Sequence, residues 1–179
     1  HVICDSSYIF MTYVDGKNYL EEKEKGALSK EEITNIEHEL GVLSKKITNI
    51  KGDNFFFPSQ PNKKFKDNYE FVLNMFQLLL NDAITYGVDL SDEVYSIILG
   101  IIHSKKESLN NIDGVSLTHT DIWDGNVLVK NGKVTGIVDF ADVYFCDEIL
   151  TFYFHTIDGI TSEYFLDGYG KTLSYDEKV

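Results

Sequence analysis

The stretch Leu117–Phe140, LTHTDIWDGNVLVKNGKVTGIVDF, decides the fold because its centre holds the strongest hairpin signal in the sequence. Asn131-Gly132 lies between two alternating apolar runs, and this dipeptide readily adopts the positive φ angles of a tight two-residue turn. A regular register predicts four cross-strand pairs: Lys130 with Lys133, Val129 with Val134, Val127 with Gly136, and Asn126 with Ile137. The face predicted to be buried then consists of Val127, Val129, Val134 and Val138.

The opposite face of this hairpin carries oxygen-bearing side chains. Asn126 and Asp139 are diagonal neighbours there, which places them ~7–8 Å apart. Two oxygen ligands that each reach ~2.1 Å to one Mg²⁺ can close that gap. Asp121 lies five residues before Asn126, on the loop that leads into the first strand. The sequence therefore predicts that two carboxylates and one amide meet at one end of the hairpin.

The spacing Asp-x-x-x-x-Asn, then a hairpin, then Asp is typical of a phosphoryl-transfer site. In that chemistry a loop Asp accepts the proton of the attacking hydroxyl, while an Asn and a second Asp bind the metal that bridges the nucleotide phosphates. Asp121 is accordingly predicted as the catalytic base, and Asn126 and Asp139 as metal ligands. The competing interpretation is a solvated hairpin, since Asp, Asn and Gly favour turns anyway. Four spaced features within 21 residues favour the site.

The run from His119 to Asn126, followed by Ile137-Val138-Asp139-Phe140, resembles the aminoglycoside phosphotransferase and choline kinase family. The form Asp-Ile-Trp-x-Gly-Asn is also similar to the ketosamine kinase branch. The resemblance implies a kinase-like fold, Mg²⁺ as cofactor and ATP or GTP as phosphoryl donor. It implies that His119 positions the loop and that Asp147 supports it. The chain departs from the family at Thr120, where Gly is usual and exchange should be tolerated, and at Thr151, where an Asp is common.

The resemblance also implies a division of the chain into two parts. Tyr8–Val14 is predicted as a strand that Asp15-Gly16 ends. Residues 1–16 would be the last strand of the small lobe and the hinge, and the backbone of Thr12, Tyr13 and Val14 would meet the adenine edge. An ordinary edge strand fits the same residues. Residues 17–179 would form the large lobe, with the catalytic loop at 117–126 and the metal hairpin at 126–140.

The parts of the small lobe that grip phosphate are missing from this sequence. It contains no Gly-rich phosphate loop and no recognisable strand lysine. The chain opens on His1 rather than Met, so we expect it to be a fragment whose small lobe is supplied by the full-length protein. On this interpretation the 179-residue piece is inactive by itself.

The rest of the chain predicts a mainly helical α+β lobe. Ser29 and Glu32 form a capping-box signature before a helix that ends by Ile50. Tyr69–Tyr86 is apolar on more than one face, which predicts a helix buried in a larger domain. Ser91 caps a third helix that ends near His103. The segment 55–64 contains both prolines and is predicted as a connecting loop.

Charge and cysteine content narrow the class of partner. The formal net charge is −13, which argues against a nucleic-acid backbone or an anionic membrane surface as the partner. From Asp113 to Val179 there are 12 acids and 4 lysines, a balance of −8, which suits a cationic acceptor or serves solubility alone. Cys4 and Cys146 match neither a disulfide framework nor a metal spacing, so we expect a reducing, cytoplasmic location.

Two functions follow from these observations. The first is a phosphotransferase that moves the γ-phosphoryl group of ATP or GTP to a hydroxyl of an aminoglycoside, another amino sugar, a choline-like compound or a ketosamine. The second is a non-catalytic module of the same fold that binds a small molecule or a nucleotide. The complete trio of Asp121, Asn126 and Asp139 favours the enzyme.

Overall fold

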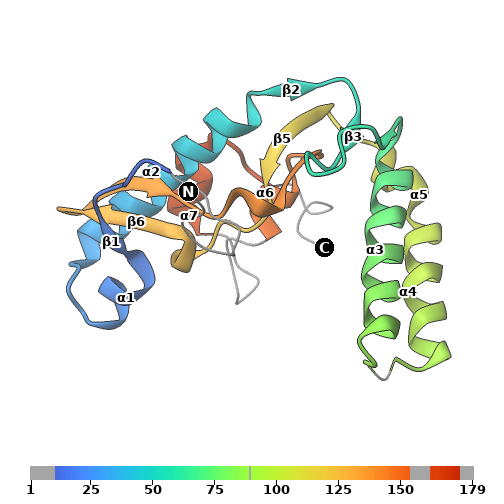
Figure 1. Cartoon of the computed structure of the whole chain (residues 1–179). Helices are drawn as coiled ribbons and strands as arrows, with labels where there is room; N and C mark the ends of the chain where they lie inside the picture. Colours follow the sequence, from blue (N-terminus) through green and yellow to red (C-terminus); the bar gives the residue numbers. More distant parts are fainter. Residues whose placement is uncertain (1–10, 89, 154–161, 174–179) are drawn as a thin grey trace, which may run out of the picture.

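The computed structural model of the chain describes residues 11–88, 90–153 and 162–173 (Figure 1). It is α+β, as predicted, and contains two antiparallel sheets. The three-stranded sheet has the order β1-β6-β7, with the bounds Lys17–Asn18, Val127–Lys130 and Lys133–Ile137. The five-stranded sheet has the order β2-β5-β8-β3-β4, with the bounds Lys51–Gly52, Val115–His119, Val143–Cys146, Phe55–Phe56 and Lys64–Phe65. The α-helices are α1 Tyr19–Glu24, α2 Lys30–Thr48, α3 Asn68–Thr85, α4 Asp92–Ser104, α5 Lys106–Asn110, α6 Leu150–Tyr153 and α7 Glu163–Tyr169.

The hairpin β6–β7 forms at the predicted place but in a different register. Asn131 and Gly132 have φ angles of 52° and 68°, as a tight turn requires. The pairs nearest the turn are as predicted, but Val127 lies opposite Ile137 and not Gly136. The predicted register is wrong there because a β-bulge lets β7 contain one extra residue. As a result the Asn126 carbonyl accepts a hydrogen bond from the N–H of Val138 at 2.9 Å, directly before Asp139.

The five-stranded sheet is a feature that the sequence does not predict. Its central strands, β5 and β8, pair from Ser116↔Cys146 to His119↔Val143. Phe55–Phe56, expected to lie in a connecting loop, forms strand β3, and that expectation is wrong. A strand of two residues is too short to show an alternation of apolar and polar side chains in the sequence. It is recognised only by its pairing with β8, in which Phe56 lies opposite Phe145 and stacks on its ring at a centroid distance of 4.7 Å.

Helix α2 is the support on which the hairpin and the C-terminal helix α7 both pack. It begins at the predicted capping box, in which Ser29 and Glu32 bond each other's backbone N–H groups. Gly41 and Gly168 lie where α2 and α7 touch, since a Cβ at either glycine would meet a backbone oxygen of the other helix at about 2 Å. The core between these elements is closed by the following buried residues: Tyr19, Ile36, Leu40, Val127, Val129, Phe152, Phe165, Tyr169 and Leu173.

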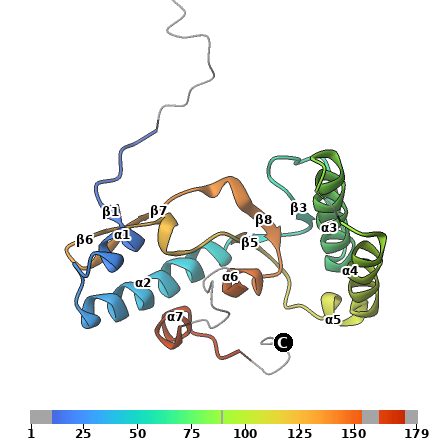
Figure 2. The ribbon, with the colours of Figure 1, turned by 90° about the horizontal axis from the view of Figure 1, so that it is seen from below.

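Helices α3 and α4 form an antiparallel hairpin that projects from the body (Figures 1 and 2). Their capping residues are Asp67 and the predicted Ser91. Phe71, at the start of α3, is buried against the aromatic residues of the five-stranded sheet. The expected burial of the whole helix is wrong, because Leu78 and Leu79 are exposed beyond the point where α3 leaves the body.

The segment before β1 differs from the predicted strand. Residues 8–10 lie outside the described residues, and residues 11–16 have no regular secondary structure. The paired strand begins only at Lys17, which lies opposite Val129 of β6. Val14 nevertheless lies against the hairpin, since its side chain would be 2.9 Å from a Cβ built on Gly136. None of the described helices is long and apolar enough to cross a bilayer.

Candidate active site

The loop that carries Asp121 starts where strand β5 ends. His119 is the last residue of β5, and Thr120 is tied to the neighbouring chain by two bonds to the Asp142 carbonyl, from its N–H at 3.1 Å and its hydroxyl at 2.8 Å. Thr120 is buried, and its hydroxyl makes a hydrogen bond that the Gly usual at this position in the resembling family could not make. A 3₁₀ turn over Asp124–Asn126 then leads into β6. The loop is therefore anchored at both ends.

His119 connects this loop to the end of the hairpin. Its Nδ1 accepts the N–H of Asp121 at 3.2 Å, so its Nε2 carries the proton and donates to the Val138 carbonyl at 3.2 Å. Its ring lies edge-on against Phe140, with the centroids 4.6 Å apart. Only 1% of His119 is exposed, and this burial lowers the pKa of His119 below its ordinary value. A neutral imidazole thus holds the two segments together.

The lowered pKa of His119 has a consequence for stability. Below pH ~6.5 the unfolded state binds a proton at this residue that the folded state does not, so stability falls as pH drops through that range. Above pH ~6.5 both states are neutral, and the residue contributes no pH dependence. Its largest contribution is about 1.4 kcal/mol per pH unit. We expect His119→Asn to flatten the decline between pH 7 and pH 5.5, measured by urea unfolding. Equal slopes in wild type and variant would contradict this account.

Asn126 and Asp121 are joined directly. The amide nitrogen of Asn126 donates to the carboxylate oxygen Oδ2 of Asp121 at 2.8 Å and to the Asp121 carbonyl at 2.9 Å. The backbone carbonyl can only accept, so the amide nitrogen must point at Asp121 and the amide oxygen Oδ1 must point elsewhere. Asn126 is buried and Asp121 is half-buried. This pair fixes one carboxylate oxygen of Asp121 and directs Oδ1 of Asn126 away from Asp121.

Asp139 follows the hairpin in an unusual backbone conformation. Its φ and ψ are 62° and 64°, in the left-handed region that a non-glycine residue rarely adopts. The preceding residue, Val138, is held by both Asn126 and His119. Asp139 itself is exposed. The strained residue is thus attached to the same framework as Asp121 and Asn126, and its carboxylate is accessible to solvent.

The oxygen donors present here fit a magnesium ion better than a softer metal. Mg²⁺ takes carboxylate and amide oxygens and retains waters and phosphate oxygens as its remaining ligands. The amide oxygen of Asn126 and the carboxylate of Asp139 are such donors. In the part of the chain that the structure describes, no group of three or more His, Cys, Asp or Glu side chains could form a complete protein cage for a metal.

Helix α1 and its capping residue contact the catalytic loop through residues that the sequence analysis does not identify. The Asn18 side chain caps α1 and donates to the Gly125 carbonyl at 2.7 Å, and Lys23 pairs with Asp124 at 2.8 Å. Both contacts fall on the turn just before Asn126. They join residues more than a hundred positions apart, so no local pattern could have revealed them.

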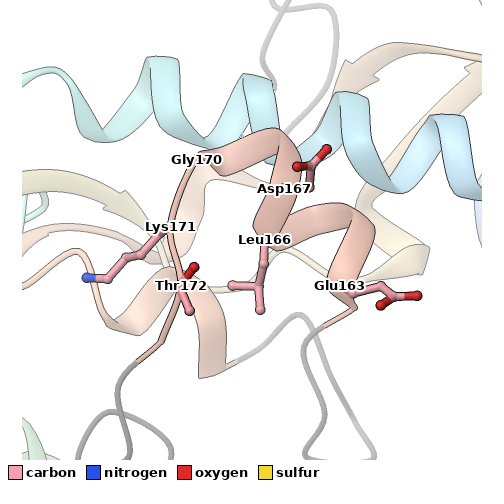
Figure 3. A pocket seen from close by; sticks show the side chains of 6 residues that line it. All are labelled: Glu163, Leu166, Asp167, Gly170, Lys171 and Thr172. Atoms are coloured by element: carbon pink, nitrogen blue, oxygen red, sulfur yellow. The ribbon is translucent and has the colours of Figure 1, made fainter.

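The remaining predicted site residues lie as follows. The Asp147 carboxylate accepts the N–H of Ile149 at 3.1 Å, before α6, so its support of the catalytic loop stays a prediction. Thr12, Tyr13 and Val14 are exposed. A separate pocket of about 350 Å³ lies beside α7 and shares no residue with the site (Figure 3). Its lining consists of Glu163, Leu166, Asp167, Gly170, Lys171 and Thr172.

Comparison with known proteins places this chain in a family. The sequence matches the phosphotransferase enzyme family over residues 3–149. Among curated proteins, none matches the chain. The fold is similar to that of ADP-bound aminoglycoside phosphotransferase APH(2'')-Ib, at 18% identity and a TM-score of 0.57 over 88% of this chain and 54% of that one. It is also similar to APH(2'')-IIa in complex with gentamicin, at 18% identity and a TM-score of 0.56 over 90% of this chain and 57% of that one. The complex of APH(2'')-IIa with streptomycin and ATP gives 18% identity and a TM-score of 0.63 over 93% of this chain and 57% of that one. The chain spans a little over half the length of these structures.

Proposed function

The chain belongs to the phosphotransferase enzyme family, and from this premise we propose that it carries the catalytic loop and metal hairpin of a small-molecule kinase. The proposed reaction moves the γ-phosphoryl group of ATP or GTP to a hydroxyl of a small acceptor. The observation that carries the proposal is the bond from the Asn126 amide to the Asp121 carboxylate at 2.8 Å, on a loop that His119 ties to the hairpin end.

Asp121 is the group proposed to receive the acceptor's proton. Its Oδ2 is occupied by the Asn126 amide, and within the described residues no hydrogen bond reaches its Oδ1. That second oxygen can accept a hydrogen bond from an approaching hydroxyl and orient it toward the phosphorus. An ordinary carboxylate suffices, because in a loose transition state the nucleophile is positioned first and loses its proton late.

Asn126 and Asp139 are proposed to hold Mg²⁺ together with the nucleotide. When bound, the ion would neutralise charge on the phosphate oxygens. The chain's own contribution is to fix the two oxygen donors: the bonds to Asp121 fix the amide plane of Asn126, and Val138 is fixed from two sides. The left-handed backbone of Asp139 is strain of the kind that is found at ligand-binding positions.

The nucleotide base is proposed to lie against the segment before β1. Val14 lies against Gly136 of β7, so the segment of Thr12, Tyr13 and Val14 reaches the hairpin that would hold the phosphates at its Val14 end. Two of the similar structures contain bound ADP and bound ATP. A Gly-rich loop and a strand lysine are proposed to come from a small lobe in the full-length protein, as is usual for kinases.

The acceptor is proposed to be a hydroxyl-bearing, cationic small molecule. The acid balance of −8 from Asp113 to Val179 favours a positive charge on the acceptor. The relatives hold gentamicin and streptomycin. Amino sugars of this kind are therefore the first acceptors to test, ahead of choline-like compounds and ketosamines.

The metal assignment is tested by nucleotide binding rather than by turnover. In the full-length protein we expect Mg²⁺ to tighten nucleotide binding in calorimetry, and Asp139→Asn to abolish that tightening. Asp113→Asn, an exposed acid outside the hairpin, serves as the matched control and should behave as wild type. Unchanged tightening in Asp139→Asn would remove Asp139 from the metal site.

A further inference from the structure

Exposed apolar side chains gather on the α3–α4 hairpin. Of the fourteen large hydrophobic residues that are exposed in the described part of the chain, eight lie between residues 78 and 101. They are Leu78, Leu79, Ile84, Tyr86, Val88, Val94, Ile97 and Ile101. Single exposed apolar residues are ordinary, but a contiguous set marks a surface for association. Figures 1 and 2 show that this hairpin stands clear of the body.

Three of these residues form a stripe along α4. Val94, Ile97 and Ile101 recur at spacings of three and four, so they share one face of the helix. Ile102 is buried, which shows that the neighbouring face is turned toward the molecule itself. Leu80 of α3 and Ile102 of α4 are both buried. Leu79 and Ile101 each precede one of these buried residues by one position, so in an antiparallel helix pair they lie on the same side of the hairpin. The stripe is therefore a second apolar face that the described residues leave uncovered.

The two ends of the stripe carry opposite charges. Glu93 lies beside Val94 and Ile97 at the start of α4, and Lys105 caps the other end, in line with Ile101. Both are exposed, and neither forms an ion pair with another described residue. In an antiparallel arrangement of two copies of α4, Glu93 of each copy faces Lys105 of the other. The same register places Ile97 of each copy opposite Ile101 of the other.

We propose that the Val94–Ile97–Ile101 face of α4 is a self-association surface that binds a second copy of this chain through an antiparallel, two-fold symmetric helix pair. A two-fold interface brings the same patch of both subunits together, so a stripe with an acid at one end and a base at the other is self-complementary. Packing of the two stripes removes apolar side chains from water, while the end charges select the antiparallel register. This goes beyond the proposed chemistry and does not depend on it.

The test is sedimentation equilibrium of the full-length protein over a concentration series, in which any further part of the same protein that covers this face would prevent self-association. We expect a monomer–dimer equilibrium, and we expect Ile97→Asp to weaken it by at least about 100-fold, because a charge would have to be buried without a partner. The matched control is Ile50→Asp: Ile50 is 51% exposed against 53% for Ile97, and it lies outside the hairpin. Circular dichroism checks that both variants fold. A wild-type full-length protein that stays monomeric, or equal weakening by both variants, would overturn the proposal.

Charge exchange tests the antiparallel register separately. Glu93→Lys and Lys105→Glu should each weaken self-association, by roughly tenfold, because both ends then bring like charges together. A mixture of the two variants restores opposite charges at both ends, so we expect it to form a heterodimer. The chain that carries both substitutions should again dimerise with itself. If the mixture associates no better than either variant alone, the antiparallel pairing is wrong.

Discussion

Replacing Asp121 with alanine should lower phosphoryl transfer by the full-length protein about 10²–10⁴-fold, the usual contribution of a positioned general base. Nucleotide affinity should change little, because the proposed metal ligands are Asn126 and Asp139. The expected loss arises because, in the proposed reaction, Asp121 presents one carboxylate oxygen to the acceptor while the Asn126 amide, at 2.8 Å, holds the other. Steady-state kinetics with a validated acceptor, together with calorimetry of nucleotide binding, measures both quantities.

Two control variants make this result specific to the base. Asp121→Asn keeps the shape and an oxygen that can accept the Asn126 bond, but it removes the basic carboxylate, so it should lose turnover almost as fully. Asp113→Ala removes an exposed acid away from the loop and should leave turnover unchanged. Thermal melting must show that each variant is folded. Wild-type turnover in Asp121→Ala would show that Asp121 is not the base.

The largest expected effect on stability comes from Phe165. Its side chain is fully buried between α7 and the core, with its ring centroid 6.1 Å from that of Phe152 and 6.3 Å from that of Tyr169. Phe165→Ala removes this contact and leaves a cavity at the junction of α2 and α7, where the backbones are too close to collapse further. We expect a loss of about 3–5 kcal/mol in the free energy of unfolding, measured by urea titration.

The neighbouring residue on the same helix provides the control. Tyr164 is 40% exposed, so Tyr164→Ala changes the sequence of α7 at almost the same position without opening the core. We expect a loss of about 1 kcal/mol or less. Similar losses for both variants would show that α7 contributes through its own helical stability and not through packing on α2.

Local chemistry accounts for the parts of the fold that the sequence predicted. The φ angles required by Asn131-Gly132 and the reciprocal bonds of Ser29 and Glu32 are properties of a few adjacent residues, and both occur in the structure. The resemblance drawn from the motif at 119–140 is confirmed at the level of the phosphotransferase family. The same spacing predicted that Asp121 and Asn126 meet, and they are hydrogen-bonded, while their roles as base and metal ligand stay predictions.

Features that depend on distant contacts were not predictable. The bulge in β7 breaks a period-two pattern that looks regular in sequence, and it determines that Val138, not Ile137, is bonded to Asn126. The brace from Asn18 to Gly125 joins residues 107 positions apart. The apolar composition of α3 predicted burial, but composition does not tell whether the covering surface belongs to the same body. In each case tertiary structure overrides a correct local preference.

The most direct test of the central claim is a phosphoryl-transfer assay with the full-length protein. The assay would use γ-labelled ATP and GTP with Mg²⁺ and a panel of amino sugars, amino alcohols and ketosamines. The account predicts label transfer to at least one acceptor hydroxyl and its loss in Asp121→Ala. If the wild-type protein binds one of these compounds tightly but transfers no label to any of them, the chain belongs to a non-catalytic binding module, and the proposed function is wrong.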